Sequence, residues 1–371
     1  MVTGWPSWNS RYRIATRVSR IKARRQSAAG AGLLSNDNLI QVAVIGVGAF
    51  GRNHARVLKQ LQQDGEAVRL LGVVDRDLAR ADTVAREFDC RAFGSLEQLL
   101  TTHSELQAAS VTVPTVDHLP VARALMDAGV DVLIEKPLAS SLAEADELIT
   151  LARCRHRIAQ VGHLERFNPA VRATLPLLTQ PMFFEGHRLS VFTPRSLDVD
   201  VVLDLMIHDL DIVLTFARST VKEVRAVGLP ILSGKTDIAN VRLEFESGCV
   251  ANLTASRVST ERVRKLRFFQ PRQYISLDYG RQDVLVFTVG DPSEVPATPS
   301  VNPQIGVTKP PVAAEEPLKA ELKAFLNAVR QRSTPVVPLE DGRRALALAL
   351  EVVEAIRVHG TRIQLDQLTR G

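Results

Sequence analysis

The segment VAVIGVGAFG, residues 42–51, decides the fold of this chain. Its first four residues are apolar and mostly β-branched, which is typical of a strand buried on both faces of a parallel sheet. Three glycines follow in the spacing G-x-G-x-x-G, and residues 52–61 then place apolar side chains at helical intervals. A tight glycine turn between a strand and a helix surrounds a pyrophosphate with backbone N–H groups. The segment therefore predicts a dinucleotide-binding site. Its residues are Gly46, Gly48, Ala49, Phe50 and Gly51.

The next predicted strand, residues 70–74, leads into Asp75, which lies 24 positions beyond Gly51. A carboxylate at this place binds the hydroxyls of the adenosine ribose, and it repels a 2′-phosphate. Asp75 therefore predicts NAD as the cofactor. The neighbouring Arg76 could instead meet the 2′-phosphate, so NADP stays open as the alternative.

Predicted strands and helices alternate from residue 40 to residue 161, which indicates a doubly wound parallel sheet, that is, a Rossmann domain. Seven more strands are predicted between residues 183 and 289, with one helix over 203–216. Several of these strands follow one another as hairpins, which predicts an α/β domain with a mainly antiparallel open sheet. The proline-rich stretch 291–315 is predicted to form a surface loop or lid, and two helices, near 317–331 and 340–358, close the chain.

The net charge of +5 comes from the N-terminal tail. Residues 1–36 hold seven basic side chains and no acidic one, whereas the rest of the chain holds 39 basic and 41 acidic residues. A near-neutral body argues against a nucleic-acid partner. Ile14, Val18 and Ile21 could lie on one face of a basic amphipathic helix that contacts lipid or targets the protein. We favour the simpler interpretation, a disordered extension or a start codon placed too early.

The predicted domain boundaries follow from these patterns. Residues 1–37 are the basic, disordered extension, residues 38–165 the NAD-binding Rossmann domain, and residues 166–371 the C-terminal domain. No apolar run approaches the roughly 18 residues that a membrane span needs. The three cysteines are far apart and form no C-x-x-C pair, so neither a disulfide framework nor a metal site is predicted. These features predict a cytoplasmic protein with no membrane span.

Two spots predict chemistry beyond the glycine turn. Glu135-Lys136-Pro137 follows a predicted strand, and a lysine ammonium there could stabilise a developing alkoxide. A lysine at a strand end is by itself more often only a surface residue. Asp204 and His208 are four apart on a predicted helix, so the carboxylate could orient the imidazole as a proton acceptor. The alternative is an N-terminal acid and a satisfied core histidine.

A third spot is the segment GHLERFNP, residues 162–169, directly after the sixth predicted strand. Arg166 and Asn168 can present donors to a phosphate or a sugar, although Asn168 could equally cap the helix that begins at Pro169. The same segment adds His163 and Glu165 as candidate substrate-binding residues. On a later predicted strand, alternation places Arg264 on the face of Leu266, and Lys265 and Arg267 on the other face. Either set could meet a diphosphate, although such charges usually lie on a solvated strand face.

With these motifs in this order from about Val42 to the C-terminus, the chain resembles the Gfo/Idh/MocA oxidoreductases. The resemblance implies an N-terminal Rossmann domain and a C-terminal substrate-binding α/β domain, whose open sheet supports contacts in a homodimer or homotetramer. It implies that Lys136 is the signature lysine and that His208, backed by Asp204, is the acid–base residue. It also implies a cofactor contact for the loop after the strand 108–113 and for the strand end. These cofactor-binding residues are Pro114, Thr115, His118, Glu135 and Lys136.

Within that family, the segment 162–171 is similar to dehydrogenases that oxidise the 3-hydroxyl of UDP-N-acetylglucosamine, and the segments 264–269 and 274–279 point the same way. The resemblance implies that the 3-keto sugar would then be aminated toward a 2,3-diamino sugar for lipid A or another glycan. The implied substrate-binding residues are Lys136, His163, Glu165, Arg166, Asn168, His208 and Arg264.

Two other functions stay open from the sequence. A dehydrogenase of a free sugar, polyol or cyclitol would not need a diphosphate site at Arg166 and Arg264. A non-catalytic NAD-binding regulator would not need both Lys136 and His208, and their presence argues against it.

Overall fold

The computed structural model describes residues 39–193, 199–290 and 305–363. The predicted N-terminal extension therefore lies outside the described residues, as does most of the predicted proline-rich loop. The chain divides into two compact units. The first unit contains residues up to Gly162 together with Leu318–Arg343, and the second contains His163–Pro317 and the residues from Arg344 onward.

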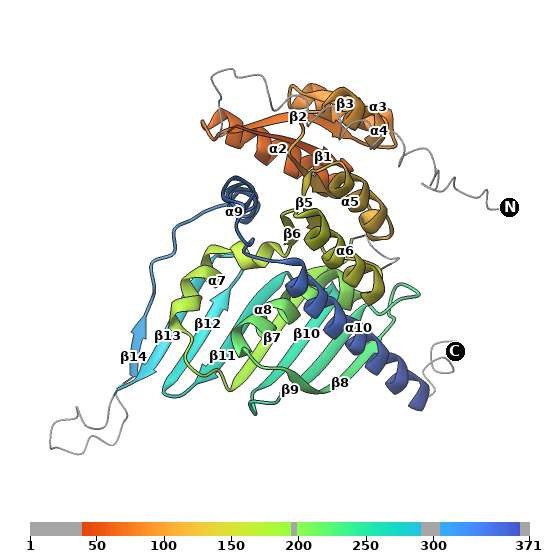
Figure 1. Ribbon diagram of the computed structural model, residues 1–371. Helices are drawn as coiled ribbons and strands as arrows, with labels where there is room; N and C mark the ends of the chain where they lie inside the picture. Colours follow the sequence, from red (N-terminus) through yellow and green to blue (C-terminus); the bar gives the residue numbers. More distant parts are fainter. Residues whose placement is uncertain (1–38, 194–198, 291–304, 364–371) are drawn as a thin grey trace, which may run out of the picture. The chain divides into compact units, whose positions relative to one another are not determined.

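The first unit is a parallel six-stranded sheet in the order β3-β2-β1-β4-β5-β6, which confirms the Rossmann prediction (Figure 1). Its strands are β1 (Ile40–Ile45), β2 (Val68–Val74), β3 (Arg91–Phe93), β4 (Ala108–Val111), β5 (Asp131–Glu135) and β6 (Ala159–Gly162). Its helices are α2 (Ala49–Gln63), α3 (Leu78–Glu87), α4 (Leu96–Thr102), α5 (His118–Asp127), α6 (Leu142–Arg155) and α9 (Pro317–Gln331). The strand order reverses between β1 and β4, and in open parallel sheets ligands bind beside the carboxyl ends of the strands at such a point.

Helix α9 is the main departure from the predicted boundaries, which placed all of residues 166–371 in the C-terminal domain. Although it follows the second sheet in sequence, α9 belongs almost entirely to the first unit. The segment after it extends the Rossmann sheet, because the Val161 amide donates to the Val337 carbonyl over 3.0 Å. This return depends on long-range pairing, which local sequence periodicity does not report.

The second unit is an eight-stranded sheet in the order β14-β13-β12-β11-β7-β10-β9-β8, as predicted mostly antiparallel, with only β7 and β10 running parallel among its described strands. Its strands are β7 (Phe183–Val191), β8 (Val221–Leu229), β9 (Ile238–Phe245), β10 (Val250–Ser259), β11 (Val263–Gln270), β12 (Gln273–Asp278), β13 (Asp283–Val289) and β14 (Ile305–Thr308). Strand β14 corrects the prediction of a loop over 291–315, since residues 305–308 pair with the edge strand β13.

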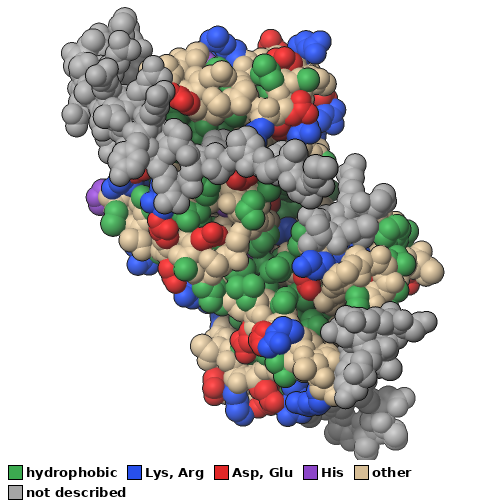
Figure 2. Space-filling model, turned by 90° about the vertical axis from the view of Figure 1, so that its right-hand side faces the viewer, with side chains coloured by type: hydrophobic (Ala, Val, Ile, Leu, Met, Phe, Trp, Pro, Cys, Tyr) green, Lys and Arg blue, Asp and Glu red, His purple; other side chains and the backbone are tan. Residues whose placement is uncertain are grey.

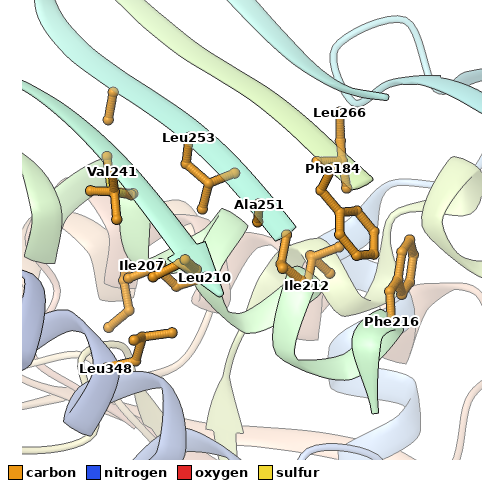
Figure 3. Packing of buried hydrophobic residues seen from close by; sticks show 14 of the residues in the cluster. Phe184, Ile207, Leu210, Ile212, Phe216, Val241, Ala251, Leu253, Leu266 and Leu348 are labelled. Atoms are coloured by element: carbon orange, nitrogen blue, oxygen red, sulfur yellow. The ribbon is translucent and has the colours of Figure 1, made fainter. Parts of the chain in front are cut away.

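One face of this second sheet packs against α7 (Pro169–Thr174), α8 (Ile207–Ala217) and α10 (Leu339–Arg362) (Figure 1). Figure 3 shows the buried side chains between these layers, with Phe184 of the sheet close to Phe216 of α8. The ring centroids of Phe184 and Phe216 are 6.5 Å apart, and Phe268 of β11 lies 5.4 Å from Phe184 and 5.8 Å from Phe216. Three fully buried aromatic rings therefore hold α8 on the sheet.

The other face of the same sheet carries a row of aromatic side chains across four strands. Phe183 of β7, Phe269 of β11, Tyr274 of β12 and Phe287 of β13 are successive cross-strand neighbours. Their ring centroids are 5.8, 4.9 and 5.1 Å apart along the row. Each of these side chains is at least partly exposed, so the row presents a continuous apolar surface.

Both signs of charge are present on the described surface (Figure 2). On the face of the molecule shown in Figure 2, acidic and basic side chains are interspersed, and neither sign gathers into one patch. All three cysteines are free. Among the described residues, no helix has both the length and the apolar character needed to cross a membrane.

Replacing Phe184 by alanine is expected to lower the free energy of unfolding by about 3–5 kcal/mol, because it leaves a cavity at the centre of the aromatic cluster. Urea denaturation measures the loss. The control is Val227→Ala on β8 of the same sheet, which is 44% exposed and should change the free energy by less than about 0.5 kcal/mol. Equal effects of the two variants would contradict this account of the core.

Candidate functional site

The glycine turn has the close packing that the sequence predicts. Gly46 has φ +89°, and a Cβ atom there would lie 2.9 Å from the carbonyl carbon and oxygen of Thr112. A Cβ at Gly51 would lie only 1.9 Å from the Gly46 oxygen, so a side chain at this position would push α2 away from the turn. Gly48 is the exposed N-cap of α2, with no side chain to occupy the first amides of the helix. Ala49 and Phe50 are exposed beside it. This cradle fits the pyrophosphate of a dinucleotide.

Asp75 lies directly after β2, and only 9% of it is exposed. Its carboxylate accepts hydrogen bonds from the amides of Val47 and Asp77, each 2.9 Å long. The guanidinium of Arg80 approaches the same carboxylate at 3.3 Å, whereas Arg76 pairs with Asp117 at 3.0 Å. The arginine that touches Asp75 is therefore Arg80, which the sequence analysis missed. It stands five positions after the acid in the first turn of α3, where the cap at Asp77 could have revealed it.

The loop after β4 contains the predicted contacts Pro114, Thr115 and His118. Pro114 is exposed and Thr115 is partly buried at the start of a short 3₁₀ turn, Thr115–Asp117. His118 is buried, and its two ring nitrogens lie 3.0 Å from the Val113 carbonyl and 3.2 Å from the Leu138 carbonyl. Burial lowers the pKa of His118, despite the carbonyl contacts that raise it. In this structure His118 joins two loops of the first unit.

Glu135 is the last residue of β5, and Lys136 follows it, partly buried, before a cis bond to Pro137. The Lys136 amide donates to the Glu135 carboxylate over 3.2 Å. Gly162 leaves the space for this carboxylate, because a Cβ there would lie 2.5 Å from Glu135 Oε1. The strand end is therefore shaped around the Glu135 side chain.

Three further residues lie near this strand end, and no sequence motif indicated them: His54, Ser110 and Glu321. His54 of α2 lies 2.6 Å from the Ser110 hydroxyl through Nδ1 and 3.2 Å from Glu135 through Nε2. Glu321 of α9 is fully buried, and burial together with the charge of Glu135 raises its pKa well above the ordinary value. A polar residue at a buried helical position was the available signal for both His54 and Glu321.

In the second unit, the predicted helix over 203–216 is not uniform. Residues Val202–Met206 form a π-helical turn, and α8 starts at Ile207. Asp204 therefore lies in the π turn and His208 in the first turn of α8, both partly buried. The argument that they share one face assumed a continuous α-helix, and the wider π turn removes that assumption. Single π turns within helices frequently occur at functional sites.

Asp209, the residue after His208, belongs to a buried cluster of charged side chains. Arg188 of β7 is 2% exposed, and its guanidinium binds both oxygens of Asp209 at 2.7 and 2.9 Å. It also donates to Glu165 over 2.9 Å and lies 5.0 Å from the ring centroid of Tyr279. Burial alone would lower the pKa of Arg188, but the charges of Asp209 and Glu165 outweigh burial and raise it. The apolar face of β7 that carries Phe184 also carries Arg188, which was the sequence signal for this residue.

The segment 162–169 joins this cluster. Asn168 is buried as the N-cap of α7, where its side-chain oxygen accepts the Ala170 amide, and its amide group donates to Glu165 and to the Tyr279 carbonyl. Arg166 binds both oxygens of Asp211 at 2.6 and 2.8 Å. The buried His163 lies 4.0 Å from Asp211. The donors of Asn168 and the fork of Arg166 are thus engaged within the protein.

Arg264 differs from these residues. It is the cross-strand neighbour of Arg188 and shares its sheet face with the buried Leu266, while Lys265 and Arg267 are exposed on the other face, as alternation predicts. Within the described part of the chain, its buried Nε has no hydrogen-bond partner, and no carboxylate comes within ion-pair distance. Burial, and next the charge of Arg188, lower the pKa of Arg264. An anion would compensate this guanidinium.

Known proteins match both parts of the chain. The family described as "Oxidoreductase family, NAD-binding Rossmann fold" matches residues 40–163, and the "GFO/IDH/MocA C-terminal domain" matches residues 180–274. A UDP-N-acetylglucosamine 3-dehydrogenase from Acidithiobacillus ferrooxidans is 39% identical over 85% of this chain and 97% of its own length. A scyllo-inositol 2-dehydrogenase from Bacillus subtilis is 26% identical over 60% of this chain and 69% of its own.

Solved structures agree with this relationship. A structure of the Acidithiobacillus enzyme superposes with a TM-score of 0.78 at 37% identity, covering 86% of this chain and 98% of the other. A myo-inositol 2-dehydrogenase from Lactobacillus plantarum, with a TM-score of 0.71 at 19% identity over 86% of this chain and 98% of its own, shares the fold. The chain therefore belongs to the Gfo/Idh/MocA family of NAD-binding oxidoreductases.

Proposed function

We propose that this protein oxidises the 3-hydroxyl of a UDP-linked N-acetylhexosamine, with UDP-N-acetylglucosamine as the first candidate, to the 3-keto sugar. The relative from Acidithiobacillus ferrooxidans is named for this substrate and reaction. It supports the proposal because the match to this chain covers 97% of that relative's length. The structural observation that carries the proposal is Arg264.

Arg264 supports a diphosphate-bearing substrate for a reason of charge balance. Arg188 forms ion pairs with Asp209 and Glu165, whereas its cross-strand neighbour Arg264 forms no ion pair with the described residues and only senses these two carboxylates from a greater distance. Like charges opposite one another on a sheet repel, so an anion that binds Arg264 would be stabilised. Arg166 would have to exchange Asp211 for a phosphate before it could take the same role.

A nicotinamide dinucleotide held by the glycine turn and Asp75 would supply the hydride acceptor for the oxidation. We propose that the Lys136 ammonium stabilises the alkoxide that develops on the hydroxyl oxygen, and that His208, oriented by Asp204, accepts its proton. Lys136 is held at the end of β5 through its amide contact to Glu135, and His208 is held by the adjacent Asp209–Arg188 pair.

Lys136→Met and His208→Ala are each expected to lower kcat by about 100-fold or more while changing the NAD affinity little, because both groups act on the transition state. Steady-state NADH formation and a cofactor titration measure the two effects. Lys323→Met, on the partly exposed surface of α9, is the control and should leave kcat unchanged. Near-normal turnover of Lys136→Met would reject its catalytic assignment.

Arg264→Gln is expected to raise KM for UDP-N-acetylglucosamine about tenfold or more with little change in KM for NAD, because a charge-assisted contact to the diphosphate is lost. The exposed Arg267→Gln on the other sheet face is the matched control and should have no such effect. Free N-acetylglucosamine should be a very poor substrate, since it lacks the anchoring group. Comparable turnover of the free sugar or of inositol would favour a polyol dehydrogenase, and no turnover of any substrate would favour a regulator.

We further propose NAD rather than NADP as the physiological cofactor, since the Asp75 carboxylate beside the glycine turn disfavours a 2′-phosphate. Arg80 and Arg76 lie nearby and reduce this discrimination. Asp75→Ala should therefore weaken NADH binding and narrow its advantage over NADPH, which fluorescence titration measures. The exposed Asp82→Ala on α3 is the control. A wild-type preference for NADPH would reverse the assignment.

We also propose that the protein forms a homodimer or homotetramer in which the aromatic row of Phe183, Phe269, Tyr274 and Phe287 is covered. The support is the continuous, partly exposed apolar surface of these four rings. The molecular mass in solution tests the proposal.

A further inference from the structure

Two glutamates meet in the interior of the first unit, and we refer to Glu135 and Glu321 as the buried acid pair. Glu135 ends β5, and Glu321 comes from α9, which joins the unit from far along the chain. Glu321 is completely buried and Glu135 is 8% exposed. The charge of Glu135 acts on Glu321, so the two carboxyl groups are electrostatic neighbours.

The polar contacts around the pair lie on the side of Glu135. Its carboxylate receives the Lys136 amide at 3.2 Å and faces His54 Nε2 at 3.2 Å. If Ser110 donates to His54 Nδ1 across their 2.6 Å contact, Nε2 carries the ring proton, and this nitrogen has no hydrogen-bond partner among the described residues. Glu135 thus accepts one backbone hydrogen bond, from the Lys136 amide, and has the His54 ring close by.

Glu321 has the opposite surroundings. Among the described residues, neither of its carboxyl oxygens has a hydrogen-bond partner, and no cation compensates it. A buried carboxylate without donors or counter-charge is strongly disfavoured, so Glu321 holds a proton. The amide oxygen of the fully buried Gln160 is also without a partner in this part of the chain. The pair as a unit therefore carries one negative charge and one proton.

The charged and titratable groups around the pair are few. The set on the neighbouring elements is completed by His54 of α2, Lys136 after β5 and His118 of α5. Burial lowers the pKa of His118, and the charge of Glu135 opposes this shift. The basic side chains of α9 itself are engaged elsewhere. Lys319 pairs with Asp64, Lys323 with Glu66, and Arg330 with the Ala67 carbonyl. The proton on the pair thus responds mainly to charge at the end of β5.

That end of the sheet is where a Rossmann domain binds its cofactor, outside the carboxyl ends of the strands. The oxidised and reduced nicotinamide rings differ by one positive charge. A positive charge near two carboxyl groups that share one proton favours the loss of that proton. The reduced ring is uncharged and therefore does not favour the loss of this proton.

We propose that the buried acid pair is a proton-binding site linked to the oxidation state of the cofactor. The pair keeps its proton when NADH binds and releases it to solvent when NAD⁺ binds. By linkage, the affinity for NAD⁺ rises with pH, by up to about tenfold per pH unit, while the affinity for NADH stays constant. The inference rests on the NAD-binding fold and is independent of the substrate proposed above.

The test is a cofactor titration without substrate at pH values from about 6 to about 9. NADH binding is followed by its fluorescence, and NAD⁺ binding by displacement of NADH. In the wild-type protein the Kd for NAD⁺ should fall several-fold per pH unit, and the Kd for NADH should stay within about twofold. Glu321→Gln keeps the shape of the side chain but cannot ionise. In this variant the Kd for NAD⁺ should be as independent of pH as the Kd for NADH.

Glu340→Gln is the matched control, because Glu340 is an exposed glutamate of the same unit that pairs with Arg153, and this variant should behave as wild type. An NAD⁺ affinity that keeps its pH dependence in Glu321→Gln would overturn the proposal, as would equal pH dependence for NAD⁺ and NADH in the wild type. A group other than Glu321 would then be the source of any pH dependence that both proteins share.

A stability measurement accompanies the titration. Because the folded protein raises the pKa of Glu321, its contribution to stability is full below the ordinary glutamate value and is lost progressively as pH rises. The melting temperature of wild type relative to Glu321→Gln should therefore fall from about pH 5 to about pH 8. If the variant does not fold, the number of protons that the wild-type protein releases on adding NAD⁺ is measured in weak buffer near pH 7.5. Release greater than that on adding NADH would support the proposal, and equal release would reject it.

Discussion

Charged side chains in the interior of this protein require a donor or an opposite charge, and this requirement organises the surroundings of both candidate sites. Arg188 satisfies it with two carboxylates and the face of Tyr279, and Asp209 is held in place beside His208 as a result. Glu135 accepts a hydrogen bond from a backbone amide and lies 3.2 Å from the ring of His54. A buried charge whose partner is removed is strongly destabilising, so these groups must be positioned together.

The exceptions to that balance are the places where function enters. Arg264 lies beside Arg188 without an ion pair to any described residue, and the anionic substrate proposed here would supply one. Glu321 has no donor, and a bound proton neutralises it. In each unit, the buried side chain that lacks a polar partner within the protein is thus the one whose charge a ligand or a proton can compensate.

The Rossmann unit combines this electrostatic arrangement with a backbone constraint. Gly46 and Gly51 allow α2 to approach the end of β1 so closely that side chains would collide, and the first amides of the helix then remain open to a pyrophosphate. Asp75 accepts a hydrogen bond from the amide of Val47 in the same turn, so the turn and the carboxylate proposed to bind the ribose are linked directly. Family membership follows from these features together with the matches to both domains.

The sequence by itself determined the elements whose signals are local. These are the strand–glycine turn–helix of residues 42–61, the alternation of strands and helices that indicates a parallel sheet, and the two faces of β11. Periodicity and turn chemistry act over a few residues, so they can be read without the fold. Only the tertiary structure decided which distant groups meet. It brought α9 and Glu321 to the Rossmann sheet, paired Arg188 with Asp209, and engaged Asn168 as a helix cap. Such contacts depend on chain returns of tens to hundreds of residues, and on how buried charges find partners, neither of which leaves a local pattern.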